Sequence, residues 1–299
     1  MTVCVAALAA ESRVIVCVAD KAISYGDYIQ WDSDSSKIAR INERGIAILM
    51  SGGEEGITKV LAGLVAVAPR LGQNVAETMK ICEEEYKKAV DDAVESRFLA
   101  PRLIHRSEYI AGISGTTINP YFRAIAEEID KFDMDCELLL CGFDLMWQPF
   151  IIDLAHPGIA ADMTRTGFHA IGSGWEKATS KLLFSEYKRT STVQRILYEV
   201  FDAKANAELD AHVGYEWDAV IVVRPPISFC EMPKEVKDLT ERVWAQFNRS
   251  PFDRYNKAEN LEPPPKNWKN KLEKLISSRV LAVLAKMEKE TDETNSTTQ

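Results

Sequence analysis

Apolar and polar positions follow two different periods along this chain, and each change of period marks a change of structure. Two apolar runs rich in β-branched residues, TVCVAALA and RVIVCVAD, flank the short polar break AES, which predicts a hairpin over residues 2–9 and 13–20. The polar, turn-rich residues 25–37 predict a loop. KIARI and GIAILMSGG predict a second hairpin around NERG, and Gly52 and Gly53 separate its last strand from a helix.

Helical spacing then alternates with strand-like runs along the rest of the first 226 residues. Asn74, with Glu77 three residues later, suits the N-cap of a helix that runs until Pro101. Residues 102–120 predict irregular chain. The other predicted elements are helices over 54–71, 121–132, 175–188 and 192–209, and strands over 136–144, 149–155, 163–174 and 216–226.

This order of elements predicts the fold class. Strands joined by short turns pair in antiparallel sheets, and helices that arrive in pairs form layers outside those sheets. We therefore expect an α+β fold, a four-layer αββα sandwich with two antiparallel sheets between helical layers. Residues 1–226 form its domain, and residues 227–299 form a C-terminal helical extension. That extension has a helix over 232–247, a Pro-rich linker, an amphipathic helix over 272–287 and a disordered tail.

Composition narrows the classes of function. The net charge of −9 disfavours nucleic acid or an anionic membrane surface as the main partner. No signal peptide or membrane-spanning run is visible, so we expect a cytoplasmic protein. The six cysteines are scattered without CxxC spacing, which predicts buried, reduced thiols. The four histidines do not cluster, so we expect no metal site and no cofactor.

Five stretches in order carry a resemblance to a known family: the strand opened by Thr2, VADKA, SSKIARI, LMSGG, and LLLCGFD followed by HAIGSGWEKA. Together they resemble the proteasome β-subunit and HslV-like family of N-terminal-nucleophile (Ntn) hydrolases over residues 2–225. The resemblance implies the Ntn hydrolase fold and a threonine nucleophile, Thr2. A threonine hydroxyl needs a base. Removal of Met1 would free the Thr2 α-amine, whose reference pKa of about 7.7–8.0 suits that task.

The resemblance assigns further roles residue by residue. Lys37 would lie beside the nucleophile and lower the pKa of the amine, and Asp20 would be the counter-charge of Lys37. Gly52 would supply the backbone N–H that holds the oxyanion. Ser173 and Asp210 match two further catalytic positions, although Ser173 equally suits a helix cap.

One departure from the family and a set of pocket positions complete the predicted site. Where the family has a serine three residues after the aspartate, this chain has Val213, so its proton network must differ, through water or His212. The substrate pocket implied by the family is formed by Ile23, Ser35, Ala39, Met50, Glu54 and Thr58. Met50 suggests an apolar floor, and Glu54 either favours a basic substrate side chain or faces solvent. Cys4 is interpreted as wall packing.

We therefore interpret the chain as a threonine-type peptidase that acts by acyl transfer on peptides or unfolded protein. Two alternatives stay open: a catalytically silent, proteasome-like structural subunit, and an Ntn amidase acting on a small molecule. The resemblance implies a homo-oligomer, ring-like or open, and leaves an ATPase unfoldase open as a partner. Neither nucleic acid nor a membrane is expected as a partner.

Overall fold

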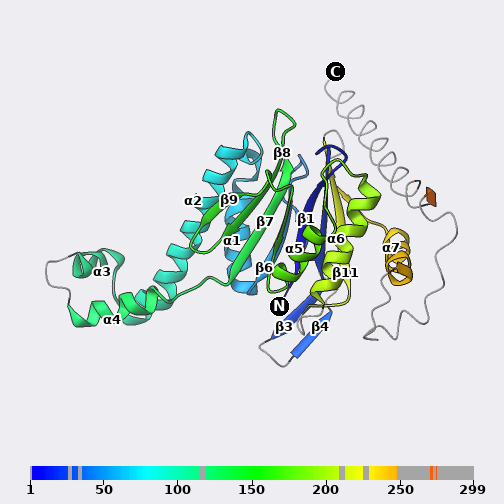
Figure 1. Ribbon diagram of the computed structural model, residues 1–299. Coiled ribbons are helices and arrows are strands. Elements are labelled where there is room, and N and C mark those ends of the chain that lie inside the picture. The colour runs from blue at the N-terminus through cyan, green and yellow to red at the C-terminus, as the bar shows by residue number, and fades with distance from the viewer. Residues whose placement is uncertain are drawn as a thin grey trace, which may run out of the picture.

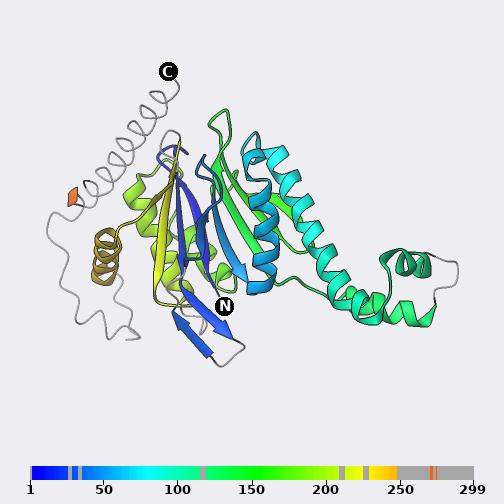
Figure 2. The same ribbon diagram turned by 180° about the vertical axis from the view of Figure 1, so that it is seen from behind.

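Two antiparallel sheets face each other and helices cover the outer face of each, as the computed structural model shows (Figures 1 and 2). It describes residues 2–25, 29–32, 36–114, 119–208, 213–224 and 229–247, together with 270, 271 and 274. Within these residues the layers run α5 and α6, first sheet, second sheet, α1 and α2. The predicted αββα sandwich is confirmed.

The first sheet holds the N-terminal hairpin at its centre, in the order β10-β1-β2-β11-β12. Its strands are β1 (Cys4–Ala9), β2 (Val14–Asp20), β10 (Phe168–Ile171), β11 (Trp217–Val223) and β12 (Phe229–Glu231). Helices α5 (Trp175–Phe184) and α6 (Val193–Ala207) cover its outer face. Since β1 is buried on both faces, its sequence is a continuous apolar run and not an alternation.

The second sheet has the order β5-β6-β7-β8-β9. Its strands are β5 (Ile38–Arg40), β6 (Ala47–Gly52), β7 (Cys136–Phe143), β8 (Pro149–Ala155) and β9 (Ile159–Asp162). Helices α1 (Glu54–Ala66) and α2 (Val75–Val94) cover its outer face. The helix after Gly53 ends before the predicted residue 71, because Pro69 begins a separate 3₁₀ turn, η1 (Ala68–Arg70). The predicted cap is confirmed: the Asn74 side chain accepts a hydrogen bond from the Glu77 N–H at 2.8 Å.

Three expectations about the elements are wrong. The stretch predicted as a loop over 25–37 contains paired strands, because β3 (Ala22–Tyr25) and β4 (Ile29–Asp32) form a two-stranded ribbon beside the N-terminus (Figure 1). The predicted strand 163–174 is shorter, since β9 ends at Asp162, a turn follows, and β10 begins at Phe168. The stretch predicted as irregular over 102–120 contains a helix, α3 (Arg106–Ile113).

That missed helix belongs to an arm that projects from the sandwich (Figures 1 and 2). The arm follows α2 through η2 (Glu95–Leu99) and η3 (Ala100–Arg102), then α3 and α4 (Pro120–Ile129). Its own small apolar cluster is centred on Leu99, Ile104 and Ile125. Because α3 buries none of its residues, its sequence carries no amphipathic signal.

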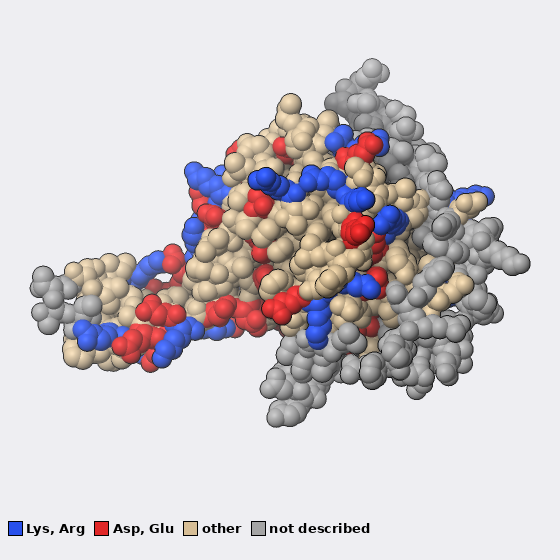
Figure 3. Space-filling model, in the orientation of Figure 1, with Lys and Arg blue, Asp and Glu red and all other residues tan. Residues whose placement is uncertain are grey.

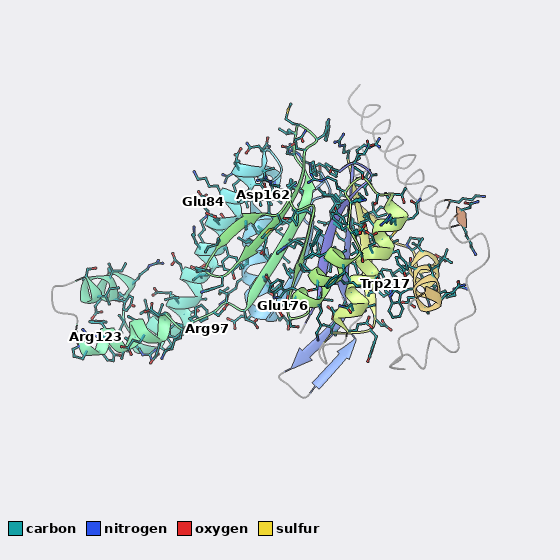
Figure 4. The ribbon with its side chains drawn as sticks, in the orientation of Figure 1. Glu84, Arg97, Arg123, Asp162, Glu176 and Trp217 are labelled. Atoms are coloured by element: carbon teal, nitrogen blue, oxygen red, sulfur yellow. The ribbon has the colours of Figure 1, made fainter. Side chains whose placement is uncertain are left out.

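The compact core continues past residue 226, where we expected the extension to begin. Strand β12 pairs with β11, and helix α7 (Lys234–Phe247) buries Val236, Leu239 and Val243 against the first sheet's outer core. Trp217, labelled in Figure 4, donates from Nε1 to a Glu241 carboxylate oxygen of α7 at 2.7 Å. The predicted helix over 232–247 is therefore part of the sandwich's periphery. The amphipathic helix predicted over 272–287 lies outside the described residues, apart from 274.

Candidate active site

Thr2 lies between the two sheets, two residues before the start of β1, and is 7% exposed. The hairpin register places Cys4 opposite Ala19, so the residues that precede β1 lie next to the end of β2. There the Val3 N–H donates to Asp20 Oδ1 at 2.9 Å, and the Asp20 N–H donates to the Val3 carbonyl at 3.1 Å. The short sequence of this hairpin thus brings a hydroxyl and a carboxylate together.

Lys37 reaches the same point from the other sheet. Its carbonyl accepts the Met50 N–H at 3.0 Å, which anchors the residue directly before β5. Its Nζ donates to Thr2 Oγ1 at 2.6 Å and to Asp20 Oδ1 at 3.0 Å. The lysine side chain is 15% exposed, and the carboxylate it meets is fully buried. Thr2, Lys37 and Asp20, predicted from separate short motifs, therefore meet.

The Asp20 carboxylate is held mainly by backbone. Oδ1 accepts from Val3 N–H and from Lys37 Nζ, while Oδ2 accepts from Ala22 N–H at 3.2 Å and Gly214 N–H at 3.0 Å. Four donors satisfy a carboxylate that lies out of contact with water, and the cation balances its charge. Lys37 is therefore held in place by a rigid, fully hydrogen-bonded counter-charge.

A glycine-flanked turn contacts the Thr2 backbone from the other side. Thr2 N lies 3.3 Å from Ser173 Oγ, and the Gly174 N–H donates to the Thr2 carbonyl at 3.3 Å. Gly172 has φ +85°, and a Cβ placed on it would lie only 2.3 Å from that carbonyl oxygen, so only glycine fits. The residue that caps α5 is Gly174, without a side-chain cap bond, so Ser173 is not that cap. Its hydroxyl contacts Thr2 instead.

Gly52 ends β6 at the entrance to α1. Its φ is +113°, and a Cβ there would lie 2.0 Å from the Asp135 carbonyl oxygen, so the position requires glycine. N–H groups alternate between the two edges of a strand, so the Gly52 N–H points to the same side as that of Met50, which is toward β5. Gly52 is exposed and lies at the N-terminus of α1, where the helix dipole favours negative charge.

The predicted pocket residues fall into three groups. Ala39 and Met50 are half-buried and pack against the core under α1 and α2. Glu54 and Thr58 are exposed on the first turns of α1. Ile23 lies on β3, where its backbone alone is described, and Ser35 lies outside the described residues. The candidate catalytic residue Asp210 also lies outside them, as does His212.

Two cores explain residues that border the site without joining its hydrogen bonds. Val213 is 3% exposed and packs in the outer core with Val3, where both crowd Gly174. Cys4 is fully buried between the sheets, and burial raises the pKa of its thiol. Its Sγ donates to the Met50 carbonyl at 3.5 Å, which fits the predicted role in the wall. All six cysteines are buried and lie outside disulfide bonds, as predicted.

Some groups at the site were missed by sequence reasoning. The Gly214 N–H contact with Asp20 leaves no trace in the sequence, because any residue except proline supplies that donor. Glu137 accepts the Gly172 N–H at 2.8 Å. It lies on β7, directly opposite Ser51 of the neighbouring strand β6. A lone charged residue in the apolar run CELLLCGF was a usable signal, because ionised side chains are rarely buried without a partner.

Neither a metal site nor a membrane segment is found among the described residues. No three His, Cys, Asp or Glu side chains gather there as metal ligands would. No helix in the described part of the chain has the length and apolar character to cross a bilayer. On the face drawn in Figure 3, basic and acidic side chains are interspersed over α5, α6 and the arm.

Comparisons with known proteins find a resemblance of structure but none of sequence family. No protein-family model matches the chain, and no curated protein matches it. Among solved structures, eukaryotic HslV from Trypanosoma brucei is similar over 74% of this chain and 99% of that chain. The sequence identity is 15% and the TM-score is 0.47. At that level the similarity carries no argument about activity, so the function must be argued from the site itself.

Proposed function

We propose that this chain is a threonine-type peptidase that cleaves peptide bonds by acyl transfer, once Met1 has been removed. The observation that carries the proposal is the chain of contacts Thr2 Oγ1, Lys37 Nζ and Asp20 at 2.6 and 3.0 Å. A lysine ammonium aimed at a nearly buried hydroxyl, and itself held by a buried carboxylate, favours the alkoxide form of that hydroxyl. Packing of the core does not require such an arrangement.

The reaction follows from the positions of these groups. Thr2 N is a peptide nitrogen while Met1 is attached, and becomes the α-amine when Met1 leaves. The amine takes the hydroxyl proton as Oγ1 bonds to the substrate carbonyl carbon, and Lys37 stabilises the developing charge. The Gly52 N–H holds the oxyanion. The amine then gives its proton to the leaving nitrogen, the C–N bond breaks, and water hydrolyses the resulting ester.

Ser173 has a defined place in this scheme. Its hydroxyl lies 3.3 Å from Thr2 N and 3.5 Å from the Thr2 carbonyl oxygen, so it can orient the amine that acts as base. The role predicted for Asp210 stays a prediction, since that residue lies outside the described part. The half-buried Met50 and Ala39 suit an apolar pocket floor. The exposed Glu54 at its rim favours substrates with a basic side chain, so Glu54→Lys should shift cleavage of peptide libraries toward acidic ones.

Two measurements test the function. The intact mass of the purified protein should equal that of the chain without Met1, because a retained Met1 leaves Thr2 N as an amide that cannot act as base. A peptide epoxyketone, which needs both hydroxyl and amine to form its ring, should add once, at Thr2. Thr2→Ala should abolish the adduct, while the matched Thr166→Ala, in the exposed turn before β10, should leave it unchanged. Quantitative retention of Met1, or an adduct that survives in Thr2→Ala, would overturn the proposal.

We further propose that the chain works as a homo-oligomer, ring-like or open. Large apolar side chains are exposed on α5, where Phe184 is 86% exposed, and on the arm, where Leu103 is 90% exposed. Contacts between copies would remove such surface from water. Sedimentation of the full chain should give a mass above that of one subunit, and a monomer at micromolar concentration would contradict the idea. An ATPase partner stays an expectation from the sequence.

A further inference from the structure

Glu137 is a charged residue in the layer between the two sheets. Leu139 and Cys141, which lie on the same face of β7, belong to the apolar core of that layer. Glu137 continues their row toward Thr2 and lies opposite Ser51 of β6. A carboxylate at such a position destabilises the fold unless it makes a specific contact. Nothing in the scheme for peptide cleavage uses it.

The contact that it makes leads directly to the nucleophile. Its Oε2 accepts the Gly172 N–H at 2.8 Å, across the gap between the sheets. Gly172 opens the turn whose next two residues contact the backbone of Thr2, Ser173 at the nitrogen and Gly174 at the carbonyl oxygen. The turn is tightly seated, since a Cβ on Gly172 would lie 2.3 Å from the Thr2 carbonyl oxygen and 2.8 Å from Ser51 Oγ.

We propose that Glu137 is a positioning residue, which holds the turn over residues 172–174 against Thr2 so that the Ser173 hydroxyl stays within reach of the nucleophile's own nitrogen. The inference rests on the proposed function for its catalytic consequence, but the positioning itself does not. Glu137 belongs to the second sheet and the turn to the first. The hydrogen bond therefore also fixes the two sheets relative to each other at the one point where Lys37 must reach Thr2.

The charge of Glu137 and its hydrogen bond to the Gly172 N–H are two separate effects, which a substitution can distinguish. Burial raises the pKa of the Glu137 carboxyl above its ordinary value, and the Gly172 N–H opposes that rise. Asp153 of β8 raises the same pKa further, and His169 of β10 lowers it. Those two side chains meet at 3.1 Å, and the Glu137 charge in turn helps to raise the pKa of the Cys4 and Cys136 thiols and of the Tyr86 hydroxyl. A glutamine at position 137 would keep an acceptor oxygen and remove the charge.

The first experiment measures catalysis. Glu137→Leu should slow the epoxyketone adduct at Thr2 by roughly tenfold or more, because a small displacement of a catalytic group is costly. The KM for a peptide substrate should change by less than about twofold, since no substrate contact is lost. The rate of adduct formation in Glu137→Gln should stay within about threefold of the wild type. Its pH–rate profile should shift to lower pH, because removal of a negative charge near the α-amine lowers the pKa of that amine. Glu84→Gln, exposed on α2 (Figure 4), is the matched control.

The second experiment does not depend on activity. Hydrogen exchange of the backbone amides over residues 168–178 should be faster in Glu137→Leu and unchanged in Glu137→Gln. If the wild type forms no adduct while exchange behaves as stated, the proposed function fails and the positioning role stands. The inference is overturned if Glu137→Leu changes neither the amide exchange nor the adduct rate. It is also overturned if Glu137→Gln is as impaired as Glu137→Leu. Glu137→Ala replaces Glu137→Leu if the latter does not fold by circular dichroism.

Discussion

Removing either member of the Lys37–Asp20 pair should abolish adduct formation at Thr2, yet the two changes should cost very different amounts of stability. Asp20→Ala leaves three backbone N–H groups without their acceptor in a fully buried place, and removes the counter-charge of Lys37. Breaking a buried pair from this side should lower the free energy of unfolding by about 3–5 kcal/mol. That is a large share of the roughly 5–15 kcal/mol of a typical domain.

Lys37→Met leaves a different situation behind. The Asp20 carboxylate keeps its three backbone donors. The Lys37 side chain that is replaced was already 15% exposed, so water can reach the position that its ammonium leaves. The loss is one charge-assisted hydrogen bond, about 1.5–3 kcal/mol, and the methionine also avoids the desolvation of the ammonium. We therefore expect the lysine variant to be folded, inert and less destabilised than the aspartate variant.

Urea unfolding followed by circular dichroism measures both costs, at one fixed protein concentration so that any assembly contributes equally. Lys59→Met is the matched control, because Lys59 pairs with Glu55 on the exposed surface of α1 and should cost less than about 1 kcal/mol. If Lys37→Met unfolds at the same urea concentration as Asp20→Ala, or below it, then the carboxylate is not held by backbone and the reasoning is refuted.

Three further changes test other parts of the structure. Gly172→Ala should abolish the epoxyketone adduct, because its Cβ would lie 2.3 Å from the Thr2 carbonyl oxygen; an unimpaired variant would show that the turn has room. Lys204→Met should lower the free energy of unfolding in urea by about 3–5 kcal/mol, because it leaves the buried Glu208 without its cation. Lys204→Met/Glu208→Met should recover most of that loss, and equal single and double variants would contradict this. Glu137→Gln should gain stability over the wild type as pH rises above 4.5, the ordinary Glu value, since the raised pKa of the half-buried carboxyl makes its ionisation cost folding energy; a difference independent of pH would contradict it.

Much of the sandwich could be predicted because its strands are covered on both faces. Burial on both sides makes β1, β2 and β7 nearly continuous apolar runs, which no exposed element imitates. The start of the long helix α2 was predictable as well, because its N-cap Asn74 and the following Glu77 form a recognisable sequence pattern. Helix α3, which was not predicted, has the opposite property. None of its residues is fully buried, so no periodic pattern distinguishes it from irregular chain.

The candidate site was predictable where it depends on side chains and unpredictable where it depends on backbone. Thr2, Asp20 and Lys37 enter the proposed chemistry through their side chains, and the order of the motifs pointed to all three residues, which the structure brings into contact. The Gly214 N–H belongs to no side chain, so only the register of the chain after α6 could place it. Glu137 was recognisable as a charged residue in an apolar strand. Its hydrogen-bond donor could not be predicted, because the Gly172 N–H lies beside the other sheet.

The departure at Val213 can be reinterpreted in this light. A serine would be expected there if the site needed a further hydroxyl, but Val213 faces the outer core, where it packs with Val3 and closes the space beside Gly174. The next residue, Gly214, supplies the contact with the site through its N–H, and Asp20 is satisfied by that donor. Lys204 of α6 bonds both the Glu208 carboxylate and the carbonyl of Tyr215, the residue after Gly214. The Gly214 N–H therefore contacts Asp20 without a side-chain hydroxyl at position 213, and Val213 packs beside Gly174, whose N–H holds the Thr2 carbonyl.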